Sequence, residues 1–595
     1  MDARRKDDGV TLRQILRLTP WSVRRRVFEA VEERVLPRVA PDRRLRIART
    51  LMPLGPARLR DRTGATTLRV RTGKRPVTAR VEPATGPVEV RRRNLDRVAQ
   101  ALDLAGIDWF RVPTRIPVRT AVAVHEADRD RVMRLLQDLV ADDHGLLRRV
   151  GRAGRRRDTP GVVAVCWPVT DPRGSMLLGP EYACEVEFWR EAEGRLRAPR
   201  RNPVTDSIAV DEPAVVAPEP VFGPFSAPDD VTGYRTRRVF TAVDPDRIDF
   251  PIDVVYTWVD GSDPAWQRRK ARALAENTWV GEISGQAAND SRYASRDELR
   301  YSLRALHSFA PWVRRVFLVT DDQVPGWLDL SHPRLTVVSH QEIFGDTGTL
   351  PTFNSQAIES RLHRIPGLAE HFLYLNDDVI LGRPVTPDLF FTPGGLTKFF
   401  PSTARVDAAP RGPADRPADS AAKNNRRLIE QTFGRVLTRK MMHTPHPSRR
   451  SVLTEIEQRF ADHVAATAGH QFRHPDDISL LSSLQQYYAY LTGRAAPGRI
   501  QYLYTDLAQP TTPLRLARLL RHRNVDAFCL NDVDADSAAV ADQEALLAEF
   551  LPTYLPFQSP FELRRPRPGT TAVPRPLTAP RQPLPPSDVA LPPVA

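Results

Sequence analysis

The chain between residues 252 and 381 alternates short apolar runs with segments of helical periodicity. A helix is predicted over residues 297–309, because Leu299, Leu303 and Leu306 recur at helical spacing. This alternation is typical of an α/β fold, in which a mostly parallel, Rossmann-like sheet has helices on both faces. The predicted strands are Ile252–Val259, Arg315–Asp322, Leu335–Val338 and Phe372–Leu375, and the apolar run Val379–Leu381 follows the last of them.

Three of these predicted strands end in acidic turns. They are Asp260-Gly261-Ser262-Asp263, Asp321-Asp322 and Asn376-Asp377-Asp378. Adjacent carboxylates at the end of a buried strand must be solvated, paired or metal-bound. One such motif is explained equally well by a solvated turn. Because the carboxyl ends of parallel strands share one edge of the sheet, the three together favour a single site for a metal ion and a nucleotide.

The first 240 residues follow a different pattern. Residues 1–65 are basic and predict short helices that pack on the rest of the protein or lie on anionic lipid. Residues 66–240 predict a small α+β domain of unknown role, and residues 198–246 are expected to be a linker. In this domain the predicted strands are Thr67–Val70, Val88–Val90, Thr120–Val124, Gly161–Val165 and Ala183–Phe188, and the predicted helices are Asn94–Ala105 and Arg129–Val140.

Beyond the predicted sheet, clusters of histidine and arginine stand at two helix entries. His443 and His446 precede one helix, and Arg473 precedes another. Helix N-termini and cations both favour phosphate oxygens, so these clusters predict a phosphate contact. Residues 398–425 are expected to be a surface excursion, and a last apolar strand ends in Asn531-Asp532. The proline-rich residues 566–595 are expected to be disordered.

The length of 595 residues favours two or three domains. The formal net charge of +15 and the pI of about 10.1 fit a polyanionic partner, such as nucleic acid, an anionic membrane or a phosphorylated substrate. A nucleic-acid-binding function is not favoured, because the arginines are dispersed and are not interleaved with aromatic residues.

Three cysteines, Cys166, Cys184 and Cys529, are too few and too scattered for a disulfide framework or a zinc site, and they favour a reducing compartment. The N-terminal residues do not resemble a signal peptide, and no run of about 18 apolar residues predicts a membrane span. We therefore expect a cytoplasmic protein, or one that lies at the inner face of the membrane.

Several stretches resemble the conserved regions of one family, the Stealth proteins. They include IDVVYTWVDGSD, LPTFNSQAIESRLHRIPGLAEHFLYLNDDVILG and FCLNDVDAD, and the resemblance covers about residues 250–565 in order. The family includes bacterial capsular and exopolysaccharide phosphotransferases and the α/β subunit of GlcNAc-1-phosphotransferase. Residues 1–240 lie outside the resemblance.

The resemblance implies a GT-A-like catalytic domain that transfers a hexose- or N-acetylhexosamine-1-phosphate. The donor would be a nucleotide-sugar such as UDP-GlcNAc, the acceptor a glycan hydroxyl, the cofactor Mg²⁺ or Mn²⁺, and a nucleoside monophosphate would be released. Carried over to this chain, the family's active-site positions are Glu359, Asp378, His443 and Arg473. One departure is that Ser295-Arg296 stands where many relatives have an acidic Asp-Asn pair.

The chemistry of this reaction suggests a role for each group. Asp377 and Asp378 would hold the metal ion, and Arg473 would clamp phosphoryl oxygens. His443 or Glu359 would accept the hydroxyl proton, or His443 would contact phosphate or form a phospho-histidine. The rival function is a metal-dependent glycosyltransferase that moves the sugar alone. Further substrate contacts are expected from Asp260, Gly261, Asp263, Arg300, Arg304, Asn354, Asn376, His446 and Asp532.

Overall fold

The structure of the protein is a computed structural model, which describes Arg43 and residues 67–72, 75–151, 158–276, 293–412, 415–531 and 537–563. The predictions made for the tail and, apart from Arg43, for residues 1–65 lie outside the described residues, as does Asp532. The division of the chain into domains stays a prediction, although in the described part no sheet joins strands from both sides of residue 250.

A five-stranded sheet forms the centre of the C-terminal unit and confirms the predicted mostly parallel α/β fold. The strand order is β16-β15-β14-β17-β22, and only β22 runs antiparallel to its neighbour. The strands are β14 (Ile252–Thr257), β15 (Val316–Thr320), β16 (Leu335–Ser339), β17 (His371–Asn376) and β22 (His446–Arg449). Thr257 of β14 pairs with Asn376 of β17, so the carboxyl ends of these two strands meet at one edge.

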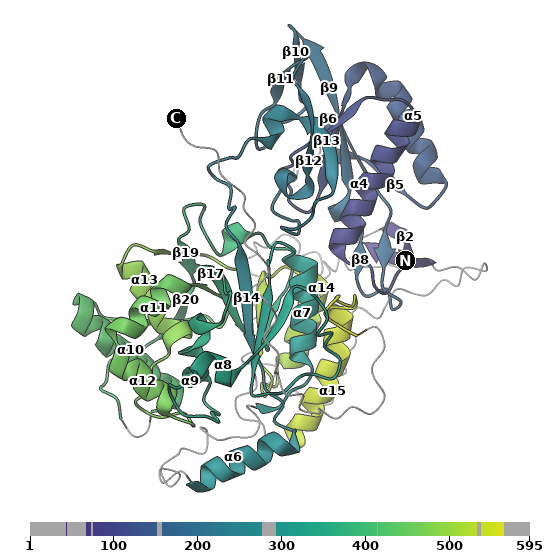
Figure 1. Ribbon diagram of the computed structural model, residues 1–595. Coiled ribbons are helices and arrows are strands. Elements are labelled where there is room, and N and C mark those ends of the chain that lie inside the picture. The colour runs from purple at the N-terminus through teal and green to yellow at the C-terminus, as the bar shows by residue number, and fades with distance from the viewer. Residues whose placement is uncertain are drawn as a thin grey trace, which may run out of the picture.

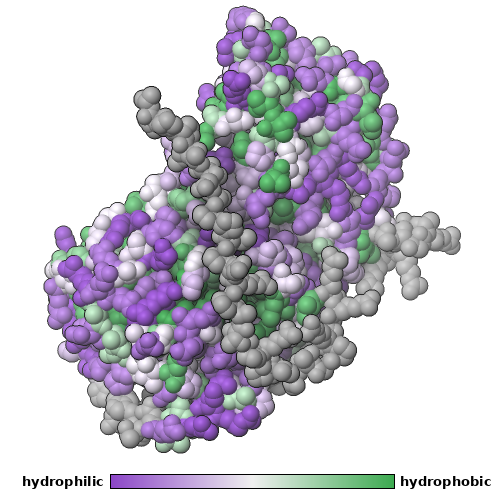
Figure 2. All heavy atoms as spheres, in the orientation of Figure 1, coloured by the Kyte–Doolittle hydropathy of each residue, from purple (hydrophilic) through white to green (hydrophobic). Residues whose placement is uncertain are grey.

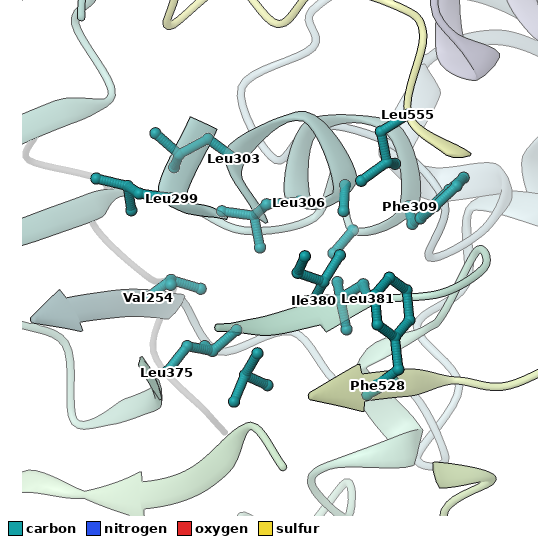
Figure 3. Close-up of a cluster of buried hydrophobic side chains, with 14 of the residues drawn as sticks. Val254, Leu299, Leu303, Leu306, Phe309, Leu375, Ile380, Leu381, Phe528 and Leu555 are labelled. Carbon is teal, nitrogen blue, oxygen red and sulfur yellow. The ribbon is translucent and has the colours of Figure 1, made fainter. Parts of the chain in front are cut away.

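Alternate residues of the central strands enter two separate hydrophobic clusters, because successive side chains of a strand point to opposite faces. Val254 belongs to one cluster and Val255 to the other. Figure 3 shows the first cluster, in which Leu299, Leu303, Leu306 and Phe309 of α7 lie over Val254 and Leu375 of the central sheet and over Ile380 and Phe528. Both faces of the sheet are therefore buried, as a parallel sheet requires.

Helices cover the two faces of the sheet (Figure 1). One face carries α7 (Glu298–Phe309), α14 (Thr512–His522) and α15 (Ser537–Tyr554). The other face carries α8 (His340–Phe344), α9 (Ser355–Glu359), α10 (Pro417–Phe433), α11 (Arg450–Arg459), α12 (Ala461–Gly469) and α13 (Gln485–Leu491). Helix α6 (Pro264–Glu276) follows the acidic turn after β14.

A small sheet continues the chain beyond the acidic pair. Strand β18 (Val379–Leu381) follows Asp378 directly and pairs with β25 (Ala527–Asn531), which in turn pairs with β24 (Tyr502–Asp506). Val379 lies opposite Cys529 in this ladder. The ladder thus brings a segment some 150 residues away along the chain next to the acidic pair.

The predicted surface excursion over residues 398–425 is wrong in part. The segment includes most of β19 (Thr397–Phe399), which pairs with β23 (Ala495–Pro497), and all of β20 (Pro401–Arg405), which pairs with β21 (Arg439–Met441). It also contains the first half of α10, whose Ala421 is fully buried. The sequence does not indicate these elements, because the abundance of proline and arginine in residues 398–425 is typical of a surface segment.

The N-terminal unit is an α+β structure, as predicted, with α4 (Pro87–Leu104) and α5 (Arg129–Ala141) packed on a sheet. The order of its main path is β11-β10-β9-β4-β3-β13-β12, and a hairpin of β5 and β6 joins at β9. The strands are β3 (Trp109–Val112), β4 (Thr120–His125), β5 (Leu146–Gly151), β6 (Asp158–Cys166), β9 (Cys184–Ala192), β10 (Arg195–Arg197), β11 (Ser207–Ala209), β12 (Ala214–Pro218) and β13 (Gly233–Arg237). A separate small sheet holds β1 (Thr67–Thr72), β2 (Arg75–Val81), β7 (Val169–Thr170) and β8 (Leu177–Leu178).

Two predictions for this unit are wrong. The expected strand Val88–Val90 is the first turn of α4, and Pro87 stands at the helix start, where its missing N–H costs nothing. The expected linker over residues 198–246 instead contains β11, β12 and β13, and β13 pairs with β3 inside the sheet.

The two units contact each other along α4 and α7, where the Nε2 atom of His307 lies 3.6 Å from Oε1 of Glu89. Hydrophilic residues cover most of the face shown in Figure 2, and hydrophobic ones form scattered groups. None of the helices in the described part of the chain is long and apolar enough to cross a membrane.

A buried ion pair fixes the end of the described chain to α7. The Glu562 carboxylate accepts hydrogen bonds from Arg300 Nε at 2.7 Å and from Arg304 Nε at 2.7 Å, and the Arg304 Nη1 group donates to the Leu555 carbonyl at 3.0 Å. The exposed fraction of the Glu562 side chain is only 1%. Arg300 and Arg304 do share one face of the helix, but that face binds the C-terminal segment.

Glu562→Ala should destabilise the C-terminal unit, because it leaves two guanidinium groups without their counter-ion. Removing one partner of a buried pair costs about 3 kcal/mol, which for a unit of this size lowers the midpoint temperature of unfolding by roughly 5 °C. Differential scanning calorimetry measures this shift. The matched control is Glu549→Ala on exposed residue 549 of α15, and equal midpoints for the two variants would contradict this role of the ion pair.

Candidate active site

A cavity of about 270 Å³ opens at the carboxyl edge of the central sheet. Its lining includes residues that directly follow β14, β15 and β17, together with residues from the two histidine and arginine clusters. The principal polar lining residues are Asp321, Asn376, Asp377, Asp378, His443, Arg473 and Asn531. A larger groove of about 860 Å³ lies between the two units, but none of the predicted site residues lines it.

One wall of the cavity is acidic. Asp377, Asp378 and Glu298 all line it, and Glu298 comes from the first residue of α7. Burial raises the pKa of Asp377 well above its usual value, and the charges of Glu298 and Asp378 raise it further. Burial also raises the pKa of Glu298 to about 7. A nearby cation would favour the ionised forms of Asp377 and Glu298, and carboxylate oxygens are the ligands that Mg²⁺ and Mn²⁺ prefer. The residues of this wall therefore fit the divalent cation that the sequence predicts.

Within this acidic wall, Asp378 also contacts His443 and Cys529. Its Oδ1 atom is 3.3 Å from Nε2 of His443, and its Oδ2 atom accepts a hydrogen bond from the Cys529 thiol at 3.1 Å. Burial lowers the pKa of His443, but the charges of Asp378 and Glu359 more than offset this effect, so the pKa is raised overall. The contact with Asp378 therefore favours the protonated form of His443.

The opposite wall carries Arg473. Its Nη2 group donates a hydrogen bond to the Ser355 hydroxyl at 2.8 Å, and both residues line the cavity. Glu359 lies just behind this wall, with an exposed fraction of 5%, and accepts a hydrogen bond from the Ser482 hydroxyl at 2.9 Å. Burial raises the pKa of Glu359, and the Arg473 charge partly offsets that rise. Of the four predicted catalytic residues, three line the cavity and the fourth lies directly behind them.

A buried polar cluster positions the segment that carries Arg473. The amide of Asn354 caps α9 and donates a hydrogen bond to Asp477 Oδ2 at 2.8 Å and another to the His470 carbonyl at 3.2 Å. The other carboxylate oxygen of Asp477 lies 2.7 Å from Nδ1 of His470. Asn354 is fully buried and does not line the cavity, so in this structure it supports the segment of Arg473, and its contact with substrate stays a prediction.

The first acidic turn does not reach the cavity lining. The Asp263 carboxylate accepts hydrogen bonds from the Ala265 amide at 2.8 Å and from Gln323 Nε2 at 3.0 Å, which caps the start of α6. A side chain at Gly261 would lie 2.5 Å from the Tyr293 carbonyl, so the turn packs tightly against that lining residue. Asp260, Gly261 and Asp263 thus lie outside the cavity lining, and their contact with substrate stays a prediction.

The remaining predicted substrate contacts divide between the lining and the interior. Asn376 lines the cavity. His446 is buried outside the lining, where burial lowers its pKa to about 3 and its ring stacks on Tyr374. Arg300 and Arg304 pair with Glu562 as described above, away from the lining, so the prediction that they bind substrate is not supported.

Two residues of the site were not predicted. The sequence does not single out Glu298, because it is the first residue of an amphipathic helix, where an acidic side chain is explained by the helix dipole. Cys529 lies in a buried strand and resembles an ordinary core residue. Only the pairing of β18 with β25 brings it to Asp378, and no spacing in the sequence indicates that contact. Arg296 also lines the cavity.

Comparison with known proteins finds all four Stealth conserved regions in this chain. Region 1 matches residues 250–278, region 2 residues 292–399, region 3 residues 442–490 and region 4 residues 517–572. The exopolysaccharide phosphotransferase SCO6023 of Streptomyces coelicolor is 47% identical over 502 residues, which cover 81% of this chain and 84% of that protein. The chain belongs to the Stealth family. This membership confirms the resemblance that the sequence motifs indicate.

Another Stealth relative is the exopolysaccharide phosphotransferase CpsY of Mycobacterium tuberculosis, which is 38% identical over 417 residues, 70% of this chain and 73% of CpsY. Among solved structures, the galactosyltransferase LgtC in complex with donor and acceptor sugar analogs matches 50% of this chain and 96% of its own. The sequence identity is 11% and the TM-score 0.26, which is too low to carry weight. The α/β assignment of this Stealth protein rests on its strand order and parallel register.

The contact between His443 and Asp378 predicts how this histidine titrates. Asp378→Asn should lower the pKa of His443, because it removes the main charge that raises it. Because the pKa of the folded state lies above the usual value near 6.5, the pairing stabilises the fold fully below about pH 6.5 and is lost as the pH rises through the folded pKa.

Nuclear magnetic resonance titration of histidine-labelled, metal-free protein measures this shift. His446 is the internal control, since its pKa of about 3 keeps it neutral in both proteins. An unchanged titration midpoint of His443 in Asp378→Asn would show that the carboxylate does not set its charge.

Proposed function

We propose that this Stealth protein transfers a sugar-1-phosphate from a nucleotide-sugar to a hydroxyl of a glycan acceptor and releases a nucleoside monophosphate. The observation that carries the proposal is the pairing of an acidic wall with two cations, His443 and Arg473, around one cavity. A metal-bound diphosphate needs carboxylates, and a phosphoryl group under attack needs cations on its remaining oxygens. The relatives SCO6023 and CpsY are named exopolysaccharide phosphotransferases, which agrees with this chemistry.

In this proposal Asp377 and Asp378 hold Mg²⁺ or Mn²⁺, which neutralises charge on the diphosphate when bound. Glu298 adds a third carboxylate to the same wall and is held by the Arg296 backbone N–H, which donates to it at 2.6 Å. Asn376, also on the lining, offers an amide to the donor. The donor is proposed to be uridine-linked.

The reaction exchanges one bond at phosphorus for another. The acceptor oxygen bonds to the phosphorus next to the sugar, and the bond from that phosphorus to the bridging oxygen of the diphosphate breaks. The nucleoside monophosphate leaves with the bridging oxygen, and the acceptor hydroxyl loses its proton to the protein. Arg473 is placed to bind the transferred phosphoryl group, because a guanidinium can bind two phosphoryl oxygens at once. Ser355 fixes the direction of that guanidinium.

His443 is the better of the two candidates for the proton acceptor, because it lines the cavity and Glu359 does not. When the charge of Asp378 is neutralised, His443 loses the main interaction that raises its pKa, and its neutral ring can accept the proton. Glu359 then acts behind the wall, where its charge favours the cationic forms of Arg473 and His443.

The proposed setting is the synthesis of an exopolysaccharide or capsule, with the reaction at the cytoplasmic side, where nucleotide-sugars are made. Binding at the inner face of the membrane is part of the same proposal. The three cysteines are unpaired and buried, which agrees with a reducing compartment.

Product analysis separates this reaction from its rival. A panel of nucleotide-sugars is incubated with the protein, an oligosaccharide acceptor and Mn²⁺, and the released nucleotide is identified by chromatography. With a uridine donor the proposal predicts UMP. UDP as the sole nucleotide product would establish the glycosyltransferase function instead.

Substitutions in the four predicted catalytic residues should abolish turnover without unfolding the protein. Asp378→Asn, His443→Ala, Arg473→Lys and Glu359→Gln should each lower kcat/KM at least about 100-fold, since each removes a charge or donor at the reacting group or directly behind it. Nucleotide release and the midpoint of thermal unfolding are measured together. The control is Asp462→Asn on exposed α12, which should keep full activity. A variant that loses activity only because it unfolds would remove that residue from the site.

A further inference from the structure

Asp378 also belongs to a second group of possible metal ligands, which includes a nitrogen and a sulfur atom. Asp378, His443 and Cys529 each offer one ligand atom, and these atoms all lie within 4.8 Å of one another. Asp378 and His443 line the cavity, and Cys529 lies directly behind them, next to the lining residues Leu530 and Asn531. An ion bound to Asp378 and His443 on the lining would lie close to the buried sulfur of Cys529.

The ligand types of this cluster differ from those of the acidic wall. One thiol, one imidazole and one carboxylate suit a borderline-soft ion such as Zn²⁺ or Co²⁺, whereas Mg²⁺ prefers oxygen ligands alone. Three protein ligands that leave an open position toward a cavity are the usual arrangement of a non-structural zinc site. Asp378 is shared, so an ion of one class excludes the other from its carboxylate.

A buried hydroxyl beside Cys529 completes the polar surroundings of this cluster. The hydroxyl of Tyr502 on β24 is buried and interacts with the side chain of Cys529. It lies within electrostatic reach of both Cys529 and Asp378. A metal-bound thiolate at Cys529 would accept a stronger hydrogen bond from this hydroxyl than the neutral thiol does.

We propose that Asp378, His443 and Cys529 form a site for Zn²⁺ or a chemically similar divalent ion, distinct from the magnesium or manganese site on Asp377 and Asp378. Binding replaces the thiol proton of Cys529, which passes to solvent as the thiolate bonds to the metal. When zinc is bound, Asp378 and His443 are metal ligands and cannot contact a bound donor. Zinc is therefore expected to inhibit any reaction that uses these two side chains. The binding itself does not rest on the proposed function.

Cobalt(II) is a suitable probe, because a cobalt–thiolate bond gives a charge-transfer absorption in the near ultraviolet. The full-length, metal-free protein is titrated with Co²⁺ without oxygen and without any sugar donor. We expect one Co²⁺ per chain with the thiolate band, loss of the band in Cys529→Ser, and displacement of Co²⁺ by Zn²⁺ but not by excess Mg²⁺. Cys166→Ser and Cys184→Ser, which alter the other buried cysteines, are matched controls and should keep the band.

Absence of the thiolate band from the unmodified protein, or its survival in Cys529→Ser, would overturn the proposal. If Cys529→Ser does not fold, His443→Ala decides, because loss of a ligand should weaken Co²⁺ binding at least roughly 10-fold. Unchanged Co²⁺ affinity in folded His443→Ala would also overturn it. Because no donor is present, the result is independent of whether the protein transfers a sugar-1-phosphate.

Discussion

The adjacent carboxylates of Asp377 and Asp378 lie at the end of a strand that is buried on both faces, and burial raises the pKa of Asp377 well above its usual value. The fold meets this constraint with charges from distant segments. His443 contacts Asp378 directly and Arg473 supplies positive charge on the opposite wall, and the parallel register of the sheet keeps the acidic pair at an edge where a cation and a diphosphate can reach it. The site thus depends on the burial of adjacent carboxylates at the end of β17 and on the charges that compensate for it.

A second layer of buried polar contacts holds these charges in place. Asn354 and Asp477 fix the segment of Arg473, and Glu359 lies behind the cationic wall. Such groups make no contact with the cavity, yet a catalytic group displaced by even 1 Å loses much of its effect. This explains how Asn354, although it does not line the site, can be as necessary to it as a lining residue.

The sequence could predict the four parallel strands of the central sheet and the acidic pair at its edge, because local patterns determine them. The apolar run before Asn376 and the spacing of Leu299, Leu303 and Leu306 depend on neighbours in the chain. Cys529 could not be predicted, since only the antiparallel pairing of β18 with β25 brings it to Asp378. The helical periodicity correctly put Arg300 and Arg304 on one face, but which partner that face meets is decided by the path of the C-terminal segment. Composition likewise does not reveal the strands within residues 198–246, because a segment rich in proline, valine and aspartate is typical of a linker.

The central claim is that the phosphorus next to the sugar moves with the sugar. A nucleotide-sugar donor radiolabelled at that phosphorus tests it directly, after incubation with a glycan acceptor and separation of the glycan from free nucleotide. The account predicts that the label appears in the glycan as a phosphodiester and that Asp378→Asn abolishes its transfer. Label retained wholly in a released nucleoside diphosphate, with the sugar alone on the glycan, would contradict the account.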